Sequence, residues 1–513
     1  MLWACLLFPS LPLEVHTRAL LPEDAPEGRV PPFVVTSGGP HPRVVAANTS
    51  ADDAGVQIGQ SLSAALALVH GLSWRDRDFS AEAAALAGIA AWATQFTPTV
   101  SLAAPDAVLA EIGGSLRLFG GLPRLAAQLA GVGELGFHAR LACAPTPTAA
   151  LLLARAGREV SIVDPARLTA AVAPLPLVHR DLDDAVLATL AATGVKTFGE
   201  ACALPRAELA RRVGTEFVAS LDRARGHCPD PRTPFVPPPR YVGRLELPAA
   251  IEDVAALSFA VNRLVCELCG WLLGRGLGIL ELVLDLVHER HAMRAGGAPA
   301  TRARFALAAP SREPAHLTAV LRERLARVAL PAPVVAIALS SEVTSALPSR
   351  SLGLLPGDDK APTVPLLDRL RARLGDEALL RVRPRAEHRP EHASTYSANA
   401  GATSAPRRKT GSTCRTTKSS NARRAKRTLP APPVPPRPLW LLAEPQPLGH
   451  LLEAQPWVLR DGPERIESGW WDGVDVRRDY FVAENPRGEI LWIYRDHRYG
   501  VDDGEWFLHG VFA

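Results

Sequence analysis

A pair of closely spaced cysteines is the first feature of this 513-residue chain whose spacing could bind a metal. Cys266 and Cys269 form a CxxC, but the surrounding "VNRLVCELCGWLL" is an apolar segment with no second ligand pair. Because a structural zinc ion needs four ligands, we expect these thiols to lie in a helical core. The sequence predicts no metal site and no cofactor, and its seven scattered cysteines favour a reducing compartment.

One local motif has the spacing to bind a phosphate. In "ATLAATGVKTFGEACALPRAELARRVG", two helical stretches flank "TGVKTFGEA". The pattern predicts a helix-hairpin-helix whose exposed backbone amides receive a DNA phosphate, with Gly194, Val195, Lys196 and Thr197 as the DNA-binding residues. An ordinary pair of helices with a short connector explains the same pattern and stays open.

The elements around this hairpin alternate in type, which predicts an α+β fold of three or four domains. "PDAVLAEIGGSLRLFGGLPRLAAQLA" reads as a strand, a Gly-Gly turn, a second short run and a helix. Further on, Leu317, Val320, Leu321 and Leu325 share one helical face between two strand-like runs. No apolar stretch of about 18 residues lacks a charge or a breaker, and the first residues lack the features of a secretory signal. We therefore expect a cytoplasmic protein without a membrane span.

A basic, low-complexity stretch follows these units. Residues 407–427, "RRKTGSTCRTTKSSNARRAKR", hold nine Lys or Arg and no acid. They lie within about 385–437, a stretch too rich in Ser, Thr, Ala and Pro to bury a core, which predicts a linker. The linker either holds DNA phosphates nonspecifically or is a solvated spacer.

The composition changes again after the linker. Residues 439–513 contain six of the ten tryptophans and three of the five tyrosines, in segments such as "EILWIYRD" and "GEWFLHGVFA". Such segments predict a small β-rich module. The aromatic residues form either its core or a protein-binding face, since Trp, Tyr and Arg are the usual interface anchors.

Taken together, these segments resemble the Y-family translesion DNA polymerases, and most closely the polymerase-like subunit of the bacterial mutasome. The resemblance is carried by "CLLFPSLPLEV", "VVAANTSADDAGVQIGQSLSAALAL", "PDAVLAEIGGSLRLFGG", "TGVKTFGEACALP", "RPLWLLAEPQPL" and "RIESGWWDGVDVRRDYFVAE". It implies a palm/fingers/thumb/little-finger architecture with a β-rich C-terminal extension. The implied parts are a palm (1–12 and 74–168), fingers (13–73), a thumb with the helix-hairpin-helix (169–235), a little finger (240–346), a clamp-peptide and linker region (347–438) and a C-terminal module (439–513).

The same resemblance identifies the catalytic positions, and these have lost their ligands. Active members carry D-x-D at the end of the first strand, which falls on Leu7 and Pro9. Their S-I-D-E motif falls on residues 104–107, where Asp106 survives and Ala107 replaces the glutamate. Two-metal phosphoryl transfer needs several carboxylates to hold two ions about 4 Å apart. One aspartate cannot do this, so we expect no catalysis at this site.

The triphosphate-binding positions are changed as well. The Tyr and Arg of the family's Y-x-A-R motif fall on Thr49 and Asp52, followed by Asp53, and a phosphate-side lysine aligns with Leu151. Replacing a cation with two anions at a polyphosphate site costs roughly several kcal/mol in a partly buried pocket. We expect no nucleotide binding here, and the alternative is an active enzyme with relocated ligands.

The resemblance further implies a set of partners. A sliding-clamp peptide falls on Ser351, Leu352, Leu354 and Leu355, where an apolar loop packed on its own domain is the alternative; Leu439 and Trp440 are a second candidate. The C-terminal module would dock an error-prone C-family polymerase subunit or a RecA-like accessory subunit. We assign Phe481 and one of Trp470 and Trp471 to its core, because alternation along an extended "RRDYFVA" separates Phe481 from Tyr480. The expected partner-binding residues are Trp470, Trp471, Arg478, Asp479 and Tyr480.

Three functions compete at this point. The first is a noncatalytic scaffold that binds primer–template DNA, the clamp and the two subunits during damage-induced mutagenesis. The second is an active low-fidelity polymerase, and the third is a helix-hairpin-helix repair factor without a polymerase partner. The lost carboxylates favour the first over the second, and the aromatic C-terminal module favours it over the third.

Overall fold

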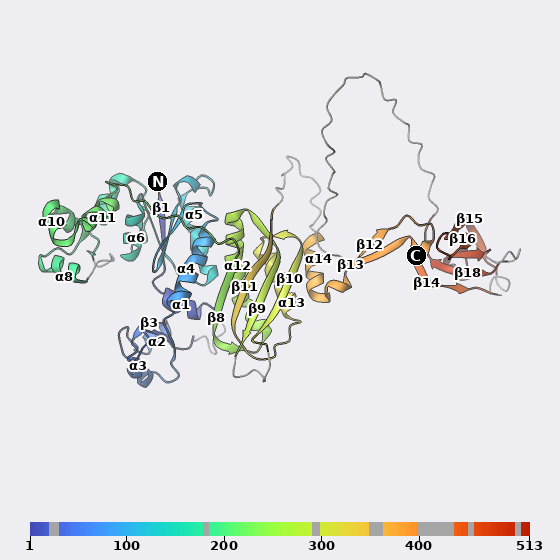
Figure 1. The fold of residues 1–513 in the computed structure, drawn as a ribbon, viewed down its shortest axis with the longest axis horizontal. Coiled ribbons are helices and arrows are strands. Elements are labelled where there is room, and N and C mark those ends of the chain that lie inside the picture. The colour runs from blue at the N-terminus through green and yellow to red at the C-terminus, as the bar shows by residue number, and fades with distance from the viewer. Residues whose placement is uncertain are drawn as a thin grey trace, which may run out of the picture. The chain divides into compact units, whose positions relative to one another are not determined.

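The computed structural model describes residues 1–19, 30–177, 184–289, 298–347, 363–398, 436–449, 456–497 and 504–512 (Figure 1). The chain divides into two compact units, Met1–Gly375 and Asp376–Ala513. Helices and sheets are mixed in the first unit, and the second is β-rich. The α+β class and the β-rich C-terminal region predicted from the sequence are therefore confirmed.

The first sheet of unit 1 is antiparallel, in the order β5-β6-β1-β7. Its strands are β1 (Trp3–Leu7), β5 (Val100–Ala103), β6 (Ala107–Glu111) and β7 (Arg140–Ala144). Every residue of β1 is buried, because alternate side chains enter two cores. Cys5 and Leu7 face the core under α6 (Pro147–Arg155), whereas Ala4 and Leu6 face the core under α1 (Leu11–Thr17), α4 (Phe79–Ala93) and α5 (Leu122–Leu129).

A small sheet in the order β3-β2-β4 lies next along the chain. It consists of β2 (Phe33–Thr36), β3 (Val44–Ala47) and β4 (Ser73–Asp76), with α2 (Thr49–Asp53) and α3 (Leu62–Leu68) between the last two strands. β2 pairs antiparallel with β3 and parallel with β4. The side chain of Asn48 begins α2 by accepting a hydrogen bond from the amide of Ala51.

Five helices follow the first sheet. They are α7 (Leu168–Val172), α8 (Asp184–Ala192), α9 (Phe198–Ala203), α10 (Arg206–Val213) and α11 (Thr215–Arg225). Their apolar side chains, such as Phe198, Phe217 and Leu221, join the core under α6. This shared core fixes α11 beside α6.

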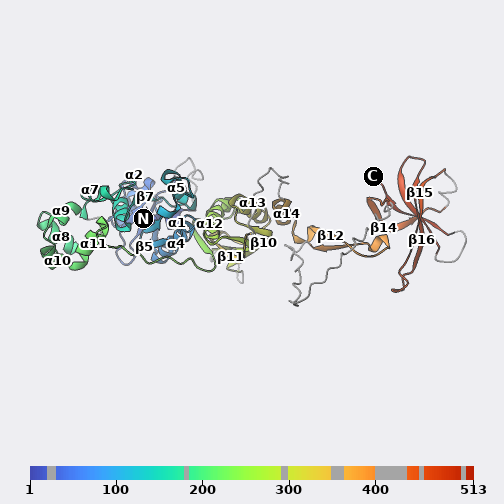
Figure 2. The same cartoon turned by 90° about the horizontal axis from the view of Figure 1, so that it is seen from above.

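A second antiparallel sheet has the order β10-β9-β11-β8. It contains β8 (Val242–Ile251), β9 (Leu277–His288), β10 (Ala300–Ser311) and β11 (Val334–Ala346), with α12 (Val254–Arg275), α13 (Pro314–Leu325) and α14 (Thr363–Leu374). Figure 2 shows α12 and α13 on the same face of the sheet. The predicted apolar face of α13 is confirmed, since Leu317, Val320, Leu321 and Leu325 are all buried.

Helix α12 contains the CxxC. Residues Ala256–Arg275 are long and apolar enough to cross a membrane by length and composition, and 61% of their most apolar window is buried in the fold. Cys269 lies in the core with Leu268 and Trp271, as the sequence predicts for a core helix.

Unit 2 contains a hairpin and a five-stranded sheet. The hairpin is β12 (Leu380–Pro384) with β13 (Ser394–Ala398), and the sheet runs β14-β18-β17-β16-β15. The sheet strands are β14 (Trp440–Pro447), β15 (Val458–Ser468), β16 (Val476–Glu484), β17 (Ile490–Asp496) and β18 (Trp506–Val511). Alternate residues of β16 and β17 enter two separate apolar clusters, so the sheet has aromatic or aliphatic packing on both faces.

The structure departs from the expected linker at its N-terminal end. Residues 385–398 belong to unit 2, with Arg389 only 4% exposed, although their polar composition predicts a solvated spacer. Their order comes from ion pairs with the distant turn after β15, as described below, and a local composition cannot reveal such pairs. The basic residues 407–427 and the predicted clamp residues Ser351, Leu352, Leu354 and Leu355 lie outside the described residues.

Candidate functional site

The strand ends of the first sheet hold the positions predicted to have lost metal ligands. Leu7 is the last residue of β1 and Ala107 the first of β6, and the two are direct partners in the antiparallel register. Both side chains lie in the core, with Leu7 3% and Ala107 0% exposed. Neither side chain has an oxygen, and Pro9 is exposed just beyond β1. The geometry brings Leu7, Asp106 and Ala107 together and leaves one carboxylate among them.

That carboxylate has an internal cation as its partner. Asp106 is one-third exposed, and its Oδ1 accepts a hydrogen bond from Nη2 of Arg155 at 3.4 Å. Arg155 is the last residue of α6, and its side chain is 12% exposed. A guanidinium therefore supplies the positive charge that a metal ion would supply to this carboxylate. No group of three or more His, Cys, Asp or Glu side chains that could hold a metal occurs within the described residues.

Of the predicted triphosphate positions, Thr49 and Asp52 carry no positive charge. Thr49 and Asp52 lie on α2, and Asp52 and Asp53 are both exposed. Leu151 is half-buried on α6, against the core shared with β1. The carboxylate of Asp52 is in the first turn of α2, where a negative charge is stabilised by the helix dipole. The presence of an acidic residue at position 52 is therefore explained by the stability of α2.

The predicted hairpin forms, with α8 and α9 on either side of Gly194, which has φ +82°. Its amides are nevertheless occupied. Gly194 and Val195 donate to carbonyls of α8, and the amides of Lys196 and Thr197 donate to Oε2 of Glu200 at 2.8 and 3.0 Å. These two hydrogen bonds lower the pKa of Glu200. The amides of Lys196 and Thr197 are therefore not free to receive a phosphate in this structure, and DNA binding by the hairpin stays a prediction.

Sequence reasoning missed a row of arginines on the second sheet. Arg302 and Arg304 alternate along β10 with Ala303 and Phe305, which are buried under the helices, so the arginines occupy the opposite face. Arg302 makes a bidentate ion pair with Asp285 of β9 at 2.7 and 3.0 Å, which raises its pKa. Arg304 lies 3.7 Å from Glu281, also on β9. The period of two in "TRARFAL" is the signal that could have found them.

The aromatic residues of β16 are core residues, which corrects their predicted place on a docking rim. Tyr480 is 1% exposed and stacks on Trp492 with ring centroids 4.0 Å apart. Its hydroxyl shares a hydrogen bond with Nδ1 of His509 at 2.8 Å and accepts one from Arg478 at 3.1 Å. Arg478 and Asp479 are 7% and 8% exposed. The physical reason is that β16 lies between β15 and β17, with side-chain cover on both faces.

The neighbouring tryptophans lie at the surface. Trp470 is 77% and Trp471 56% exposed, in the turn between β15 and β16, and their rings meet edge to face at 5.5 Å. The expectation that one of them enters the core is wrong, whereas Phe481 does pack partly buried in the cluster opposite Tyr480. Both tryptophans lie in the turn beyond the ends of β15 and β16, so neither indole reaches the core of the sheet.

One nearly buried arginine, Arg389, connects this turn to the segment before the hairpin strand β13. Arg389, with its side chain 5% exposed, donates to Oδ1 and Oδ2 of Asp472 at 3.1 and 2.5 Å and to the carbonyl of Val474 at 3.3 Å. The Ser468 hydroxyl donates to Glu387 at 3.1 Å, and Glu387 also pairs with Arg389. Gly469 has φ +89°, and a Cβ there would lie 2.1 Å from the Val474 carbonyl. We define Gly469–Asp475 as the tryptophan turn, in which Trp470, Trp471 and Val474 are exposed apolar side chains.

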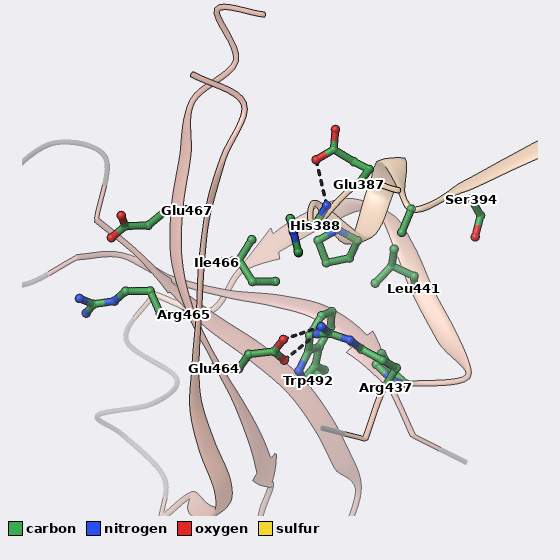
Figure 3. A pocket seen from close by; sticks show the side chains of 13 residues that line it. Glu387, His388, Ser394, Arg437, Leu441, Glu464, Arg465, Ile466, Glu467 and Trp492 are labelled. Carbon is green, nitrogen blue, oxygen red and sulfur yellow. Dashed lines mark hydrogen bonds and ion pairs between the residues drawn. The ribbon is translucent and has the colours of Figure 1, made fainter. Parts of the chain in front are cut away.

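A pocket of about 640 Å³ lies in unit 2 (Figure 3). Ile466, Leu441 and Trp492 supply its apolar surface. Arg437 forms a bidentate ion pair with Glu464 at one side of the pocket, and the Arg437 guanidinium lies 5.0 Å from the Trp492 ring centre. The segment at Glu387 and His388 lines the pocket from another side, so one segment both lines it and braces the tryptophan turn.

Part of this chain is similar to known proteins. Residues 21–155, which include most of the first sheet, match the model of the impB/mucB/samB family. Among solved structures, DinB from Sulfolobus solfataricus is 15% identical with a TM-score of 0.36, over 67% of this chain and 98% of that one. An insertion ternary complex of Dbh DNA polymerase is also 15% identical, with a TM-score of 0.37 over 67% and 98%. The chain therefore contains a region similar to the impB/mucB/samB family.

Relatives over the full length are more specific. Protein ImuB from two strains of Caulobacter vibrioides is 30% identical over 495 residues, which are 90% of this chain and 100% of the relative. The chain belongs to the ImuB family.

Proposed function

We propose that this chain is a noncatalytic Y-family polymerase homologue that acts in translesion synthesis and damage-induced mutagenesis. One observation carries the proposal: Leu7 and Ala107, which the resemblance assigns to two metal-binding carboxylates, are buried apolar residues, and Arg155 pairs with Asp106. Without those ligands, two-metal phosphoryl transfer has no site. Family membership makes the chain polymerase-like, and the side chains at the strand ends support a role other than polymerisation.

Its proposed first role is to hold primer–template DNA. The arginine row of β10 and the basic residues 407–427 supply positive charge for phosphates. Each described arginine of that row has a carboxylate partner, so a phosphate must compete with Asp285 or Glu281. In the hairpin from Gly194 to Thr197, the exposed Lys196 side chain is the remaining candidate contact, since the amides are occupied.

Its proposed second role is to connect proteins. We assign Ser351, Leu352, Leu354 and Leu355 to the sliding clamp. The tryptophan turn of unit 2, with Trp470 and Trp471, is assigned to an error-prone C-family polymerase subunit or a RecA-like accessory subunit of the ImuA type. The aromatic exposure and the rigid bracing of the turn support this assignment, because preorganised Trp anchors bind at a low entropic cost. The proposed location is the cytoplasm, at the nucleoid.

Primer extension tests the proposed lack of polymerase activity. The purified full chain, given primer–template, nucleotides and Mg²⁺ or Mn²⁺, should extend no more primer than buffer alone. Template-dependent extension that disappears in Asp106→Ala would overturn the proposal.

Surface plasmon resonance tests the clamp assignment. Changing Leu354 and Leu355 to Ala should remove most clamp binding, since burying two leucines contributes on the order of 3–6 kcal/mol before ordering costs are subtracted. Unchanged binding would move the assignment to Leu439 and Trp440 or remove it.

A further inference from the structure

The pocket of about 640 Å³ in unit 2 has one of the chain's own arginines in its wall. Nη1 of Arg437 donates to the Glu464 carboxylate at 2.7 Å, and the guanidinium lies 5.0 Å from the centre of the Trp492 ring. Figure 3 shows the two contacts from Glu464 to this guanidinium next to the indole. A carboxylate and an aromatic ring both attract a guanidinium, the first by bidentate hydrogen bonds and the second by its negative face. The wall of the pocket is therefore suited to an arginine side chain.

The pocket has negative charge beyond this ion pair. Glu467 lines it as well, and the structure gives this carboxylate no ion pair among the residues that it describes. Glu387 and Arg465 also belong to the lining, but each is paired with a residue outside it, Arg389 and Asp479 respectively. One carboxylate of the lining is thus free for a cation, and a second would become free if the chain's own arginine left.

The ion pair between Arg437 and Glu464 is of a kind that can be exchanged. Its two side chains are 41% and 25% exposed, and exposed ion pairs contribute little to stability. Glu464 and Trp492 also line a neighbouring cavity of about 200 Å³, so open space lies on both sides of them. Arg389 is the contrasting case, since its side chain is 5% exposed and pairs with two carboxylates. Arg437 can leave its place without opening the core of the sheet.

We propose that this pocket binds an arginine side chain from an extended, basic segment of a partner protein, in exchange for Arg437. The incoming guanidinium takes the place on Glu464 and Trp492, and its methylene groups pack on Ile466 and Leu441. A lysine fits less well, because its ammonium is a point charge that neither bonds both carboxylate oxygens nor stacks on the indole.

The position of the pocket favours an extended segment. Residues 464–467 of β15 all line it, and β15 is an edge strand of the five-stranded sheet. An edge strand offers backbone groups that an added strand can pair with. Glu467 then receives a second cation of the same segment. This site depends neither on the assignment of the tryptophan turn nor on the proposed lack of polymerase activity.

Nuclear magnetic resonance of the full chain with ¹⁵N-labelled tryptophan tests the site through the indole N–H of Trp492. The probe is a glycine pentapeptide with one central arginine and blocked ends. It should shift the Trp492 signal saturably, and the same peptide with a central lysine should bind about fivefold or more weakly. The absence of a saturable shift would overturn the proposal. Equal affinity for the two peptides would also overturn it, because only charge would then matter.

A matched pair of variants separates the pocket from a general effect of charge. Glu464→Gln should weaken binding of the arginine peptide about tenfold or more, the effect of losing charge-assisted hydrogen bonds. Glu484→Gln should leave it unchanged. Glu484 is the matched control because it pairs with Arg460 on the same sheet, is 26% exposed and lies outside the lining. Equal losses in the two variants would contradict the site.

Arg437→Gln gives a result that misfolding cannot imitate. Removing the internal competitor should tighten binding of the arginine peptide about two- to fivefold, the size expected for an exposed ion pair. Arg460→Gln, which breaks the matched ion pair, should leave the affinity unchanged. Unchanged or weaker binding in Arg437→Gln would overturn the exchange.

Two further variants distinguish this site from other parts of the chain. The alternative occupant is the chain's own basic stretch 407–427, which precedes the cavity-lining Pro436. Changing its nine Lys and Arg to Gln should not alter peptide binding; tightening as in Arg437→Gln would overturn the assignment to a partner. Trp470→Ala with Trp471→Ala should also leave peptide binding intact. A loss in that variant would place the site at the tryptophan turn and overturn the proposal.

Discussion

Restoring carboxylates at the strand ends should not restore polymerisation, and the structure gives the size of the penalty. Leu7→Asp removes a fully buried leucine, worth about 1.5–3 kcal/mol. Because Leu7 and Ala107 are direct cross-strand partners, Leu7→Asp with Ala107→Glu places two carboxylates about 5 Å apart. Their repulsion at an effective dielectric constant of 20 is about 3 kcal/mol. The double variant should therefore lose about 5 kcal/mol, a large part of the stability of a typical domain.

Thermal melting and primer extension of this double variant test the reasoning together. We expect a melting temperature lower by roughly 10–20 °C, no rescue by Mg²⁺ or Mn²⁺ because Arg155 holds Asp106, and no primer extension. Leu102→Asp is the matched control: it lies in the same sheet, on β5, is 40% exposed, and should cost little. A double variant that melts like this control, or gains stability with Mn²⁺ and extends a primer, would refute the account of the site.

Three further perturbations test other parts of the molecule. Glu200→Gln should raise duplex-DNA affinity about two- to fivefold in fluorescence anisotropy, because an anion leaves the amides of the hairpin; unchanged affinity would place the hairpin away from DNA. Trp470→Ala with Trp471→Ala should change unfolding free energy by less than about 0.5 kcal/mol while weakening partner capture more than about tenfold; intact capture would exclude the tryptophan turn. Burial lowers the pKa of His509 from 6.5 to about 4, so the unfolded chain binds this proton first and stability is lost as pH falls from 6.5 towards 4. Hydrogen exchange in β16–β18 should report a loss of up to about 3 kcal/mol, which His509→Gln abolishes.

The sequence predicted the parts of the fold whose signals are local. β1 is a continuous apolar run because both of its faces are covered, and the turn at Gly194 needs a residue with positive φ. The apolar face of α13 follows from its helical spacing. Each of these features depends on residues within about ten positions of one another, so the pattern alone was sufficient.

The prediction of the docking residues failed because their burial depends on residues far away in the sequence. Alternation along β16 correctly separated Phe481 from Tyr480. It could not say that both faces of the sheet are covered, because the cover includes Glu391, which contacts Arg478 at 3.0 Å from a segment that looks like a linker. Exposure of Trp470 and Trp471 likewise depends on Arg389, about eighty residues earlier in the chain.

At two sites of this chain, a charged side chain of the protein occupies the place where we expect a polymerase to bind a metal ion or a phosphate. At the strand ends, the guanidinium of Arg155 lies against Asp106, the position of a cation. At the hairpin, the carboxylate of Glu200 accepts hydrogen bonds from the amides of Lys196 and Thr197, where a phosphate was predicted. An internal partner of either kind is present at every ligand concentration, so an external ion must displace it before it can bind. Arg155 takes the place of a cation at the sheet, and Glu200 takes the place of an anion at the hairpin. In both cases the neighbouring groups have a partner without an external ion. We therefore expect a chain that satisfies these positions internally to keep its fold without polymerase chemistry.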